Sequence, residues 1–262
     1  MTLAAIAAPL AFAAFVWWFS TGMILWLNRL QRRTFAWTFA AVSVASCVAL
    51  FLLIVRAGDT SVAGAYIAFT SAVLIWGWHE MSFLMGYIVG PRRDVCPADA
   101  KGWRRFRLAA STLMHHEIAL ALTVVAFFTL TWGQPNQFGA LTFLLLWVMR
   151  LSAKFNLFLG APYRAEELMP AHLEHLKSYF RHRRMNLLFP VSIVGGAMLC
   201  AIVGIQAFSP DTSAFDQTGL LLLLSLATLG VIEHVFLFVP PPNAALWGWA
   251  APEARKQDNP AS

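Results

Sequence analysis

The sequence predicts an all-α polytopic membrane protein with seven transmembrane helices, and three observations lead to this fold class. Of the 262 residues, 59% are hydrophobic and only 12% are charged, and the mean hydropathy is +0.63. Apolar stretches of spanning length recur along the whole chain, and Lys and Arg gather in alternate loops between them. Because an ordinary soluble domain has about a quarter of its residues charged, this composition excludes a soluble globular enzyme and a disordered chain.

A bilayer crossing takes about 20 apolar residues, and seven stretches meet this length. They lie at residues 5–27, 35–56, 64–89, 108–132, 138–160, 187–208 and 218–239. No Lys or Arg precedes the first stretch, so it lacks the positive region of a signal peptide and we expect it to be a retained span. The prediction is therefore one seven-helix domain over residues 1–240, followed by a short cytoplasmic tail over 241–262.

The loops alternate between basic and uncharged or acidic. The loop after the third span holds six Lys and Arg residues, whereas the next loop, GQPNQFG, has no charge. By the positive-inside rule, the N-terminus is expected on the periplasmic side and the C-terminus in the cytoplasm. The net charge of +6 is thus explained by loops at a membrane surface, and we expect the lipid bilayer as a partner and no nucleic acid.

The fifth loop, at about residues 161–186, is long enough to have structure of its own. After Pro170 it reads AHLEHLKSYFRHRR, in which Leu173, Leu176 and Phe180 fall on one α-helical face. This pattern predicts an amphipathic helix lying in the membrane interface between spans five and six. His172 and His175 are three residues apart on it, and we expect them to face headgroups or solvent, with metal binding as the alternative.

Ionisable residues inside the predicted spans are the strongest functional signal. Four of the seven histidines stand next to a glutamate, whereas composition alone predicts about 0.4 such neighbours. Three of these pairs, His79–Glu80, His116–Glu117 and Glu233–His234, lie within spans. An ionisable side chain at the centre of a span costs about 2.5 to 3.5 kcal/mol unless it faces a partner or water. These residues therefore need partners.

The topology places these residues at one depth, roughly 6 to 15 Å inside the cytoplasmic boundary, since a helix rises about 1.5 Å per residue. We expect one buried polar cluster there. Its candidate members are His79, Glu80, His115, His116, Glu117, Arg150, Lys154, Asn156, Glu233 and His234. Because neighbouring helix positions are about 100° apart, one residue of the triplet HHE is expected to point elsewhere.

Three interpretations of the cluster stay open. In the first it is structural, with the glutamates neutralising Arg150 and Lys154. In the second it is an iron or zinc site, although the motifs Glu-x-x-His and HExxH are both absent. In the third a histidine nitrogen is the axial ligand of a tetrapyrrole metal. The candidate metal ligands are His79, Glu80, His116, Glu117, Glu233 and His234, and no catalytic residue can be assigned.

Five strings make a family resemblance visible. They are WGWHEMSFLMG, GPRRDVCP, HHE, SAKFNLFLGAP and HLEHLKSYF, in this order along the chain. With them the sequence resembles the PuhE family of photosynthetic complex assembly proteins from purple bacteria.

The resemblance implies a protein of the cytoplasmic or intracytoplasmic photosynthetic membrane that assists the assembly of reaction centres and light-harvesting complexes, or the supply of bacteriochlorophyll. Its partners would be subunits of those complexes or pigment-biosynthesis proteins. The resemblance brings no catalytic residues. The alternative is a membrane metalloenzyme, a metal-dependent oxidoreductase with His- and Glu-ligated non-haem iron or zinc that acts on a pigment or isoprenoid.

Overall fold

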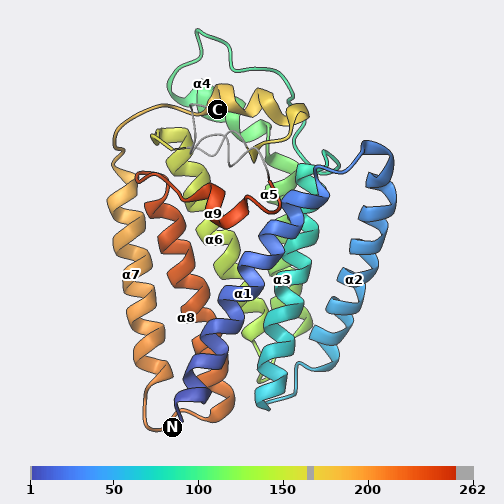
Figure 1. Ribbon diagram of the computed structural model, residues 1–262, viewed down its shortest axis with the longest axis vertical. Helices are drawn as coiled ribbons and strands as arrows, with labels where there is room; N and C mark the ends of the chain where they lie inside the picture. Colours follow the sequence, from blue (N-terminus) through green and yellow to red (C-terminus); the bar gives the residue numbers. More distant parts are fainter. Residues whose placement is uncertain (1, 164–167, 252–262) are drawn as a thin grey trace.

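The computed structural model describes residues 2–163 and 168–251, which form a helical bundle without strands. Seven long helices run along its long axis, neighbours in sequence pointing in opposite directions (Figure 1). They are α1 (Leu3–Leu27), α2 (Phe35–Val55), α3 (Val62–Leu84), α5 (Met114–Leu130), α6 (Phe138–Leu159), α7 (Leu188–Ala207) and α8 (Ala214–Val235). The shorter elements are η1 (Arg32–Thr34), α4 (Gly102–Ser111), η3 (Ala171–Tyr179) and α9 (Asn243–Trp247).

The helix α3 is the packing centre of the bundle. It lies against α1, α2, α5, α6 and α8, and 13 of its 23 residues are buried. Small residues such as Ala65, Ala68 and Ala72 let the neighbouring helices approach it closely. The helices α2 and α7 form two edges of the bundle (Figure 1) and present many large apolar side chains outward. This is the surface expected of helices that face lipid.

Six helices of the described part are long and apolar enough to cross a bilayer, and the pair α4 and α5 would add a seventh if both are counted as one span. The chain is therefore a multi-pass membrane protein. The prediction of one continuous span over 108–132 is wrong, because the chain bends by 69° between α4 and α5.

The bend is held by the loop that precedes α4. Gly90 packs directly on the backbone of Ser111 and Thr112, where no side chain would fit. Val89 O accepts a hydrogen bond of 2.9 Å from the backbone N–H of His116, in the first turn of α5. A backbone donor that has no partner within its helix is thus satisfied from outside.

The segment predicted as an interfacial amphipathic helix has a different structure. Its ordered core is the 3₁₀ helix η3, in which Leu173, Leu176 and Tyr179 are buried. Side chains three residues apart eclipse one another in a 3₁₀ helix, so these residues form one face. The two leucines pack on Phe83 and Val89, inside the protein. The apolar residues therefore follow the three-residue spacing of a 3₁₀ helix, and the predicted α-helical spacing is wrong.

The C-terminal residues up to 251 pack on the bundle. The indole N–H of Trp18 donates to Leu246 O at 3.0 Å, and the rings of Trp17 and Trp247 lie 5.6 Å apart. Trp249 covers Gly22 of α1. The first part of the predicted tail is thus a segment that covers α1, and residues 252–262 lie outside the described residues.

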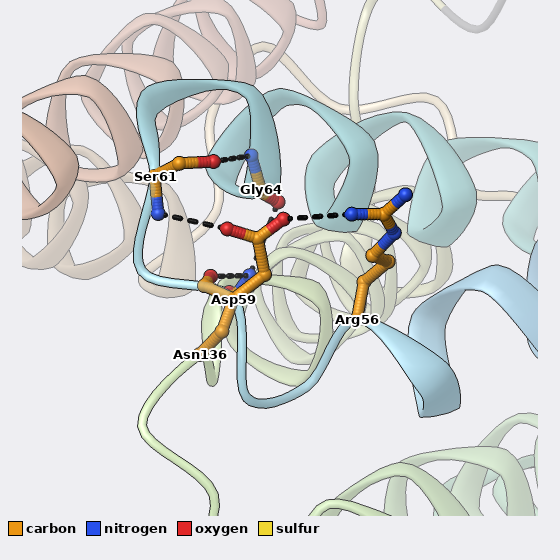
Figure 2. A network of polar contacts seen from close by, with 5 residues as sticks. All are labelled: Arg56, Asp59, Ser61, Gly64 and Asn136. Carbon is orange, nitrogen blue, oxygen red and sulfur yellow. Dashed lines mark hydrogen bonds and ion pairs between the residues drawn. The ribbon is translucent and has the colours of Figure 1, made fainter.

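At the end of the bundle away from the C-terminal segment, a polar network joins the turn between α2 and α3 to the turn between α5 and α6 (Figure 2). Asp59 accepts from the Ser61 backbone N–H at 2.9 Å and pairs with Arg56 at 3.3 Å. The Asn136 amide donates to the backbone carbonyls of Asp59 and Gly64, both at 3.1 Å. The Ser61 hydroxyl caps α3 by accepting from Gly64 N.

This network predicts that Gly64→Ala destabilises the protein. A Cβ at Gly64 would lie 2.5 Å from the Asp59 carbonyl oxygen, too close without moving the turn. We expect a loss of about 1 to 3 kcal/mol in the free energy of unfolding, measured by thermal unfolding in detergent. The matched control is Gly195→Ala on α7, where nothing lies within 4 Å. An equal loss in both variants would contradict the prediction.

Candidate functional site

The predicted polar cluster lies near one end of the bundle, which we name the basic end because it carries the basic loops at residues 28–34, 85–101 and 168–187. Glu80 is four residues from the end of α3, and Glu117 is in the first turn of α5. Both are closer to a helix end than predicted, because α3 ends at Leu84 and α5 begins at Met114. The opposing cations, Arg150 and Lys154, are on α6.

The closest pair joins α5 to α6. Lys154 Nζ lies 2.5 Å from Glu117 Oε1, and the Trp147 indole N–H donates to Glu117 Oε2 at 3.0 Å. The side chains of Lys154 and Glu117 are 16% and 22% exposed. Lys154 Nζ also lies 6.0 Å from the ring centroid of Phe83. Both carboxylate oxygens of Glu117 are therefore engaged.

A second, looser group joins α3, α6 and α8. Arg150 lies 3.6 Å from Glu80 Oε2, and Glu80 Oε1 lies 3.9 Å from His116 Nε2, beyond hydrogen-bond distance. Glu233 of α8 is near enough to Arg150 for their charges to attract, although among the described residues no ion pair within 4.0 Å joins the two side chains. The Arg150 side chain is 46% exposed and Glu233 is also exposed, whereas Glu80 is buried. Arg150 thus has carboxylates from two helices around it and remains accessible.

Two histidines are buried beside these pairs. His116 is completely buried, and neither of its nitrogens has a hydrogen-bond partner among the described residues. His79 Nε2 lies 2.9 Å from the Thr123 hydroxyl, while its other nitrogen has no such partner. Their rings pack on Phe83 and Phe143, respectively. Buried polar atoms usually have a partner, so these atoms are suited to ordered water or a small ligand.

Asn156 and His234 belong to a separate, neutral group, which we name the polar seam. His234 Nε2 lies 2.9 Å from the Ser152 hydroxyl, which lies 2.9 Å from that of Ser192. The Asn156 amide donates to Ser192 Oγ at 3.0 Å and to the Ser152 carbonyl at 3.0 Å. These hydrogen bonds join α6, α7 and α8, and the structure thereby divides the predicted cluster into a charged part and a neutral part.

His115 lies outside both groups. Its side chain is exposed, whereas that of the next residue, His116, is buried. The reason is that consecutive helix positions point about 100° apart. His115 is therefore the residue of the triplet HHE that points elsewhere, as one of the three was expected to do, and its inclusion among the cluster residues is corrected.

Several polar partners were not anticipated from the sequence. They are Thr123, Trp147, Ser152 and Ser192. Trp147 could have been found by its spacing, because residues 147, 150 and 154 share one face of a helix. The serines and the threonine carry no such signal, since single hydroxyl residues are common in membrane helices.

The arrangement can be tested against the two cofactor classes considered above. Among residues 2–163 and 168–251, no three His, Cys, Asp or Glu side chains are close enough together to hold a metal ion. A tetrapyrrole needs an imidazole nitrogen with open space in front of it. His79, His116 and His234 are at most 4% exposed, so the buried imidazoles do not fit a macrocycle. The residues as arranged fit charge pairing best.

His172 and His175, the two histidines predicted at the membrane interface, lie in η3 at the basic end. A Cβ at Gly86 would lie 3.3 Å from the His172 ring, which shows how closely η3 is packed on the loop after α3. His172 and His175 are half-buried, and His172 Nε2 has no hydrogen-bond partner in the described chain. They are therefore less open to headgroups and solvent than expected.

The chain matches, over residues 3–258, a family described as "Protein of unknown function (DUF3623)". It belongs to the DUF3623 family. A relative is the "Uncharacterized 30.4 kDa protein in puhA 5'region" of Rhodobacter capsulatus, 41% identical over 244 residues, which are 91% of this chain and 88% of that protein. No solved structure matches this DUF3623 member. The family match covers all seven long helices, so the charged cluster and the polar seam lie within the shared region.

Removing Lys154 should destabilise this DUF3623 member strongly. Lys154→Met leaves the partly buried Glu117 carboxylate without its cation, which costs up to about 3 to 5 kcal/mol. The measurement is the free energy or midpoint of thermal unfolding in detergent. The double variant Glu117→Gln/Lys154→Met should recover most of the loss. The matched control is Lys177→Met, whose partner Glu174 is 69% exposed and where the loss should be below about 1 kcal/mol. Equal losses for Lys154→Met and Lys177→Met would refute a stabilising role of the pair between Lys154 and Glu117.

The docking of η3 should weaken as the pH falls. Burial lowers the pKa of His172 and of His175 below the ordinary value of 6.5. Arg32 and Arg93 lower the pKa of His172 further, and Arg93 lowers that of His175 while Asp94 raises it. The undocked segment therefore binds protons more readily than the docked one, and stability is lost as the pH drops below about 6.5.

The measurement is the thermal unfolding midpoint between pH 7.5 and 5. The wild type should lose stability more steeply below about pH 6.5 than the variant His172→Gln/His175→Gln. The control is His182→Gln, whose residue is exposed. Parallel pH profiles for the wild type and the double variant would contradict the docking argument.

Proposed function

We propose that this protein is a non-catalytic assembly factor for photosynthetic reaction centres and light-harvesting complexes, as the resemblance to the PuhE family implies. It would act in the cytoplasmic or intracytoplasmic membrane, with its N-terminus periplasmic and its C-terminus cytoplasmic. Its partners would be subunits of these complexes or pigment-biosynthesis proteins, and bacteriochlorophyll would be handled at its surface or through those partners.

The observation that carries the proposal is the paired state of the charges inside the membrane. Glu117 is engaged by Lys154 and Trp147, and Glu80 lies beside Arg150. A catalytic acid or base must be within reach of the proton that it transfers. A carboxylate with two donors on it and little exposed surface is better suited to holding helices together.

The name of the relative supports the process. That protein is named for its position in the 5' region of puhA, a reaction-centre gene, and is 41% identical to this chain. Neighbouring bacterial genes often act in one process, so a gene beside puhA is well placed to encode a protein that acts on the reaction centre. The relative is itself uncharacterised, so the assignment to assembly is part of the proposal.

One observation favours the alternative, a membrane metalloenzyme. The His116 imidazole is buried with both nitrogens unpartnered, and its Nε2 is 3.9 Å from Glu80 Oε1. These are ligand types of iron and zinc. Ligand atoms must approach a metal within about 2 to 2.3 Å, so at least a third ligand and a rearrangement would be needed.

The deciding experiment combines deletion with complementation in a purple bacterium. Deletion should reduce the near-infrared absorption of reaction-centre and light-harvesting complexes in isolated membranes several-fold, and the wild-type gene should restore it. Complementation with His116→Leu, which removes a ligand but keeps an apolar core, should also restore it. Immunoblotting of the membranes provides the control for protein level.

Elemental analysis of the purified wild-type protein completes the test. Stoichiometric iron or zinc, together with a failure of His116→Leu at normal protein level, would overturn the non-catalytic proposal in favour of the metalloenzyme. Unchanged complexes in the deletion strain would refute a role in assembly.

A further inference from the structure

The helix α4 is the amphipathic surface element of this protein. It reads GWRRFRLAAS, and the 69° bend to α5 turns it across the basic end of the bundle instead of along it (Figure 1). Only Arg105 is buried among its residues. An exposed helix with arginines and aromatic residues, lying close to the plane of the membrane surface, is typical of an interfacial helix.

An aromatic surface runs from α4 to the end of α6. Trp103 is 69% exposed and stacks on Phe106 with 4.9 Å between ring centroids. Phe106 in turn lies 6.4 Å from the ring of Phe155 and 5.8 Å from that of Phe158. Phe155 is 38% exposed on a membrane-spanning helix. The surface is therefore continuous with the part of α6 that faces lipid, and Trp103 stands where interfacial tryptophans are found.

A group of three arginines, Arg105, Arg181 and Arg183, lies directly beside this surface. Arg105 stacks over the Phe158 ring at 4.3 Å and donates to the carbonyls of Phe158 and Tyr179, which are neutral. Arg181 and Arg183 are close enough to Arg105 to repel its charge. Within the described ranges, no carboxylate forms an ion pair with any of these three arginines.

The backbone holds the second and third arginine in place. Arg181 donates its N–H to Leu157 O at 3.3 Å and accepts from Ala161 N at 3.1 Å, so it is fixed to the end of α6. The stem of Arg183 packs on Gly160, where a Cβ would come within 2.8 Å of it. Three arginines are thus held together, and among residues 2–163 and 168–251 no carboxylate is paired with them, which favours an anion from outside.

We propose that Arg181 and Arg183 bind the phosphate of an anionic phospholipid, whose acyl chains lie along Trp103, Phe106 and Phe155. Arg105 is buried behind them, and its positive charge adds to theirs. A soluble anion would not need the aromatic surface that leads into the membrane. A zwitterionic lipid would leave the three charges without net compensation. By the positive-inside rule, the lipid would come from the cytoplasmic leaflet, where anionic lipids attract basic side chains.

The test uses the full chain purified in detergent, with dioleoyl phosphatidylglycerol and dioleoyl phosphatidylcholine as probes. Phosphatidylglycerol should raise the thermal unfolding midpoint in a saturable way, and phosphatidylcholine should not. The variant Arg181→Gln/Arg183→Gln should lower the apparent affinity for phosphatidylglycerol about fivefold per arginine, the effect of one basic side chain at an anionic surface. Salt at 0.5 M should weaken binding to the wild type.

The matched control is Arg32→Gln/Arg33→Gln, which removes two exposed charges from another basic loop. It should keep the wild-type affinity. Equal stabilisation by both lipids, an equal loss in the control variant, or saturation of the same effect by inorganic phosphate would each overturn the proposal. A midpoint without lipid that stays near the wild-type value confirms that the tested variants are folded.

Discussion

The charge pairing between α6 and its neighbours is the constraint on which the rest of the structure depends. Arg150 and Lys154 are four residues apart and share one face of α6, while Glu80 comes from α3 and Glu117 from α5. In an apolar medium, a charge without a counter-charge costs far more than in water. One helix therefore neutralises carboxylates on two others, and this favours the observed register of the three helices.

The bend before α5 makes this pairing fit the length of the bundle. Because the chain turns at Thr112 and Leu113, α5 begins at Met114 and brings Glu117 to the level of Lys154. The loop through Val89 and Gly90 packs on the bend and satisfies the first turn of α5. Leu173 and Leu176 of η3 then pack on Val89 in the same loop. The charge pairing, the bend before α5 and the packing of η3 thus depend on one another at the basic end.

The sequence predicts much of this fold because hydropathy and loop charge are strong signals. The positions of the long helices and the gathering of acids and bases near one end follow from them. The depth of the cluster does not, because residues 108–113, LAASTL, are apolar enough to be taken as the start of the span predicted at 108–132, whereas they form the end of α4 and the bend before α5. The sequence also could not decide whether residues 171–179 form an α-helix or the 3₁₀ helix η3. Phe180 completes an α-helical face with Leu173 and Leu176, whereas Tyr179 completes a 3₁₀ face, and tertiary packing selects the second.

The orientation of α6 about its own axis is set by polar residues on two of its faces. Ser152 and Asn156 point to the polar seam with α7 and α8, while Arg150 and Lys154 point to the carboxylates. These two pairs are offset by two residues, or about 200°, so they lie on nearly opposite faces. A rotation by one residue would bring Lys154 toward lipid, at a cost of about 2.5 to 3.5 kcal/mol for the charge alone. Apolar packing would tolerate such a rotation, because leucines surround much of the helix. The few polar residues therefore determine which helices α6 contacts, and with them the position of every group in the charged cluster.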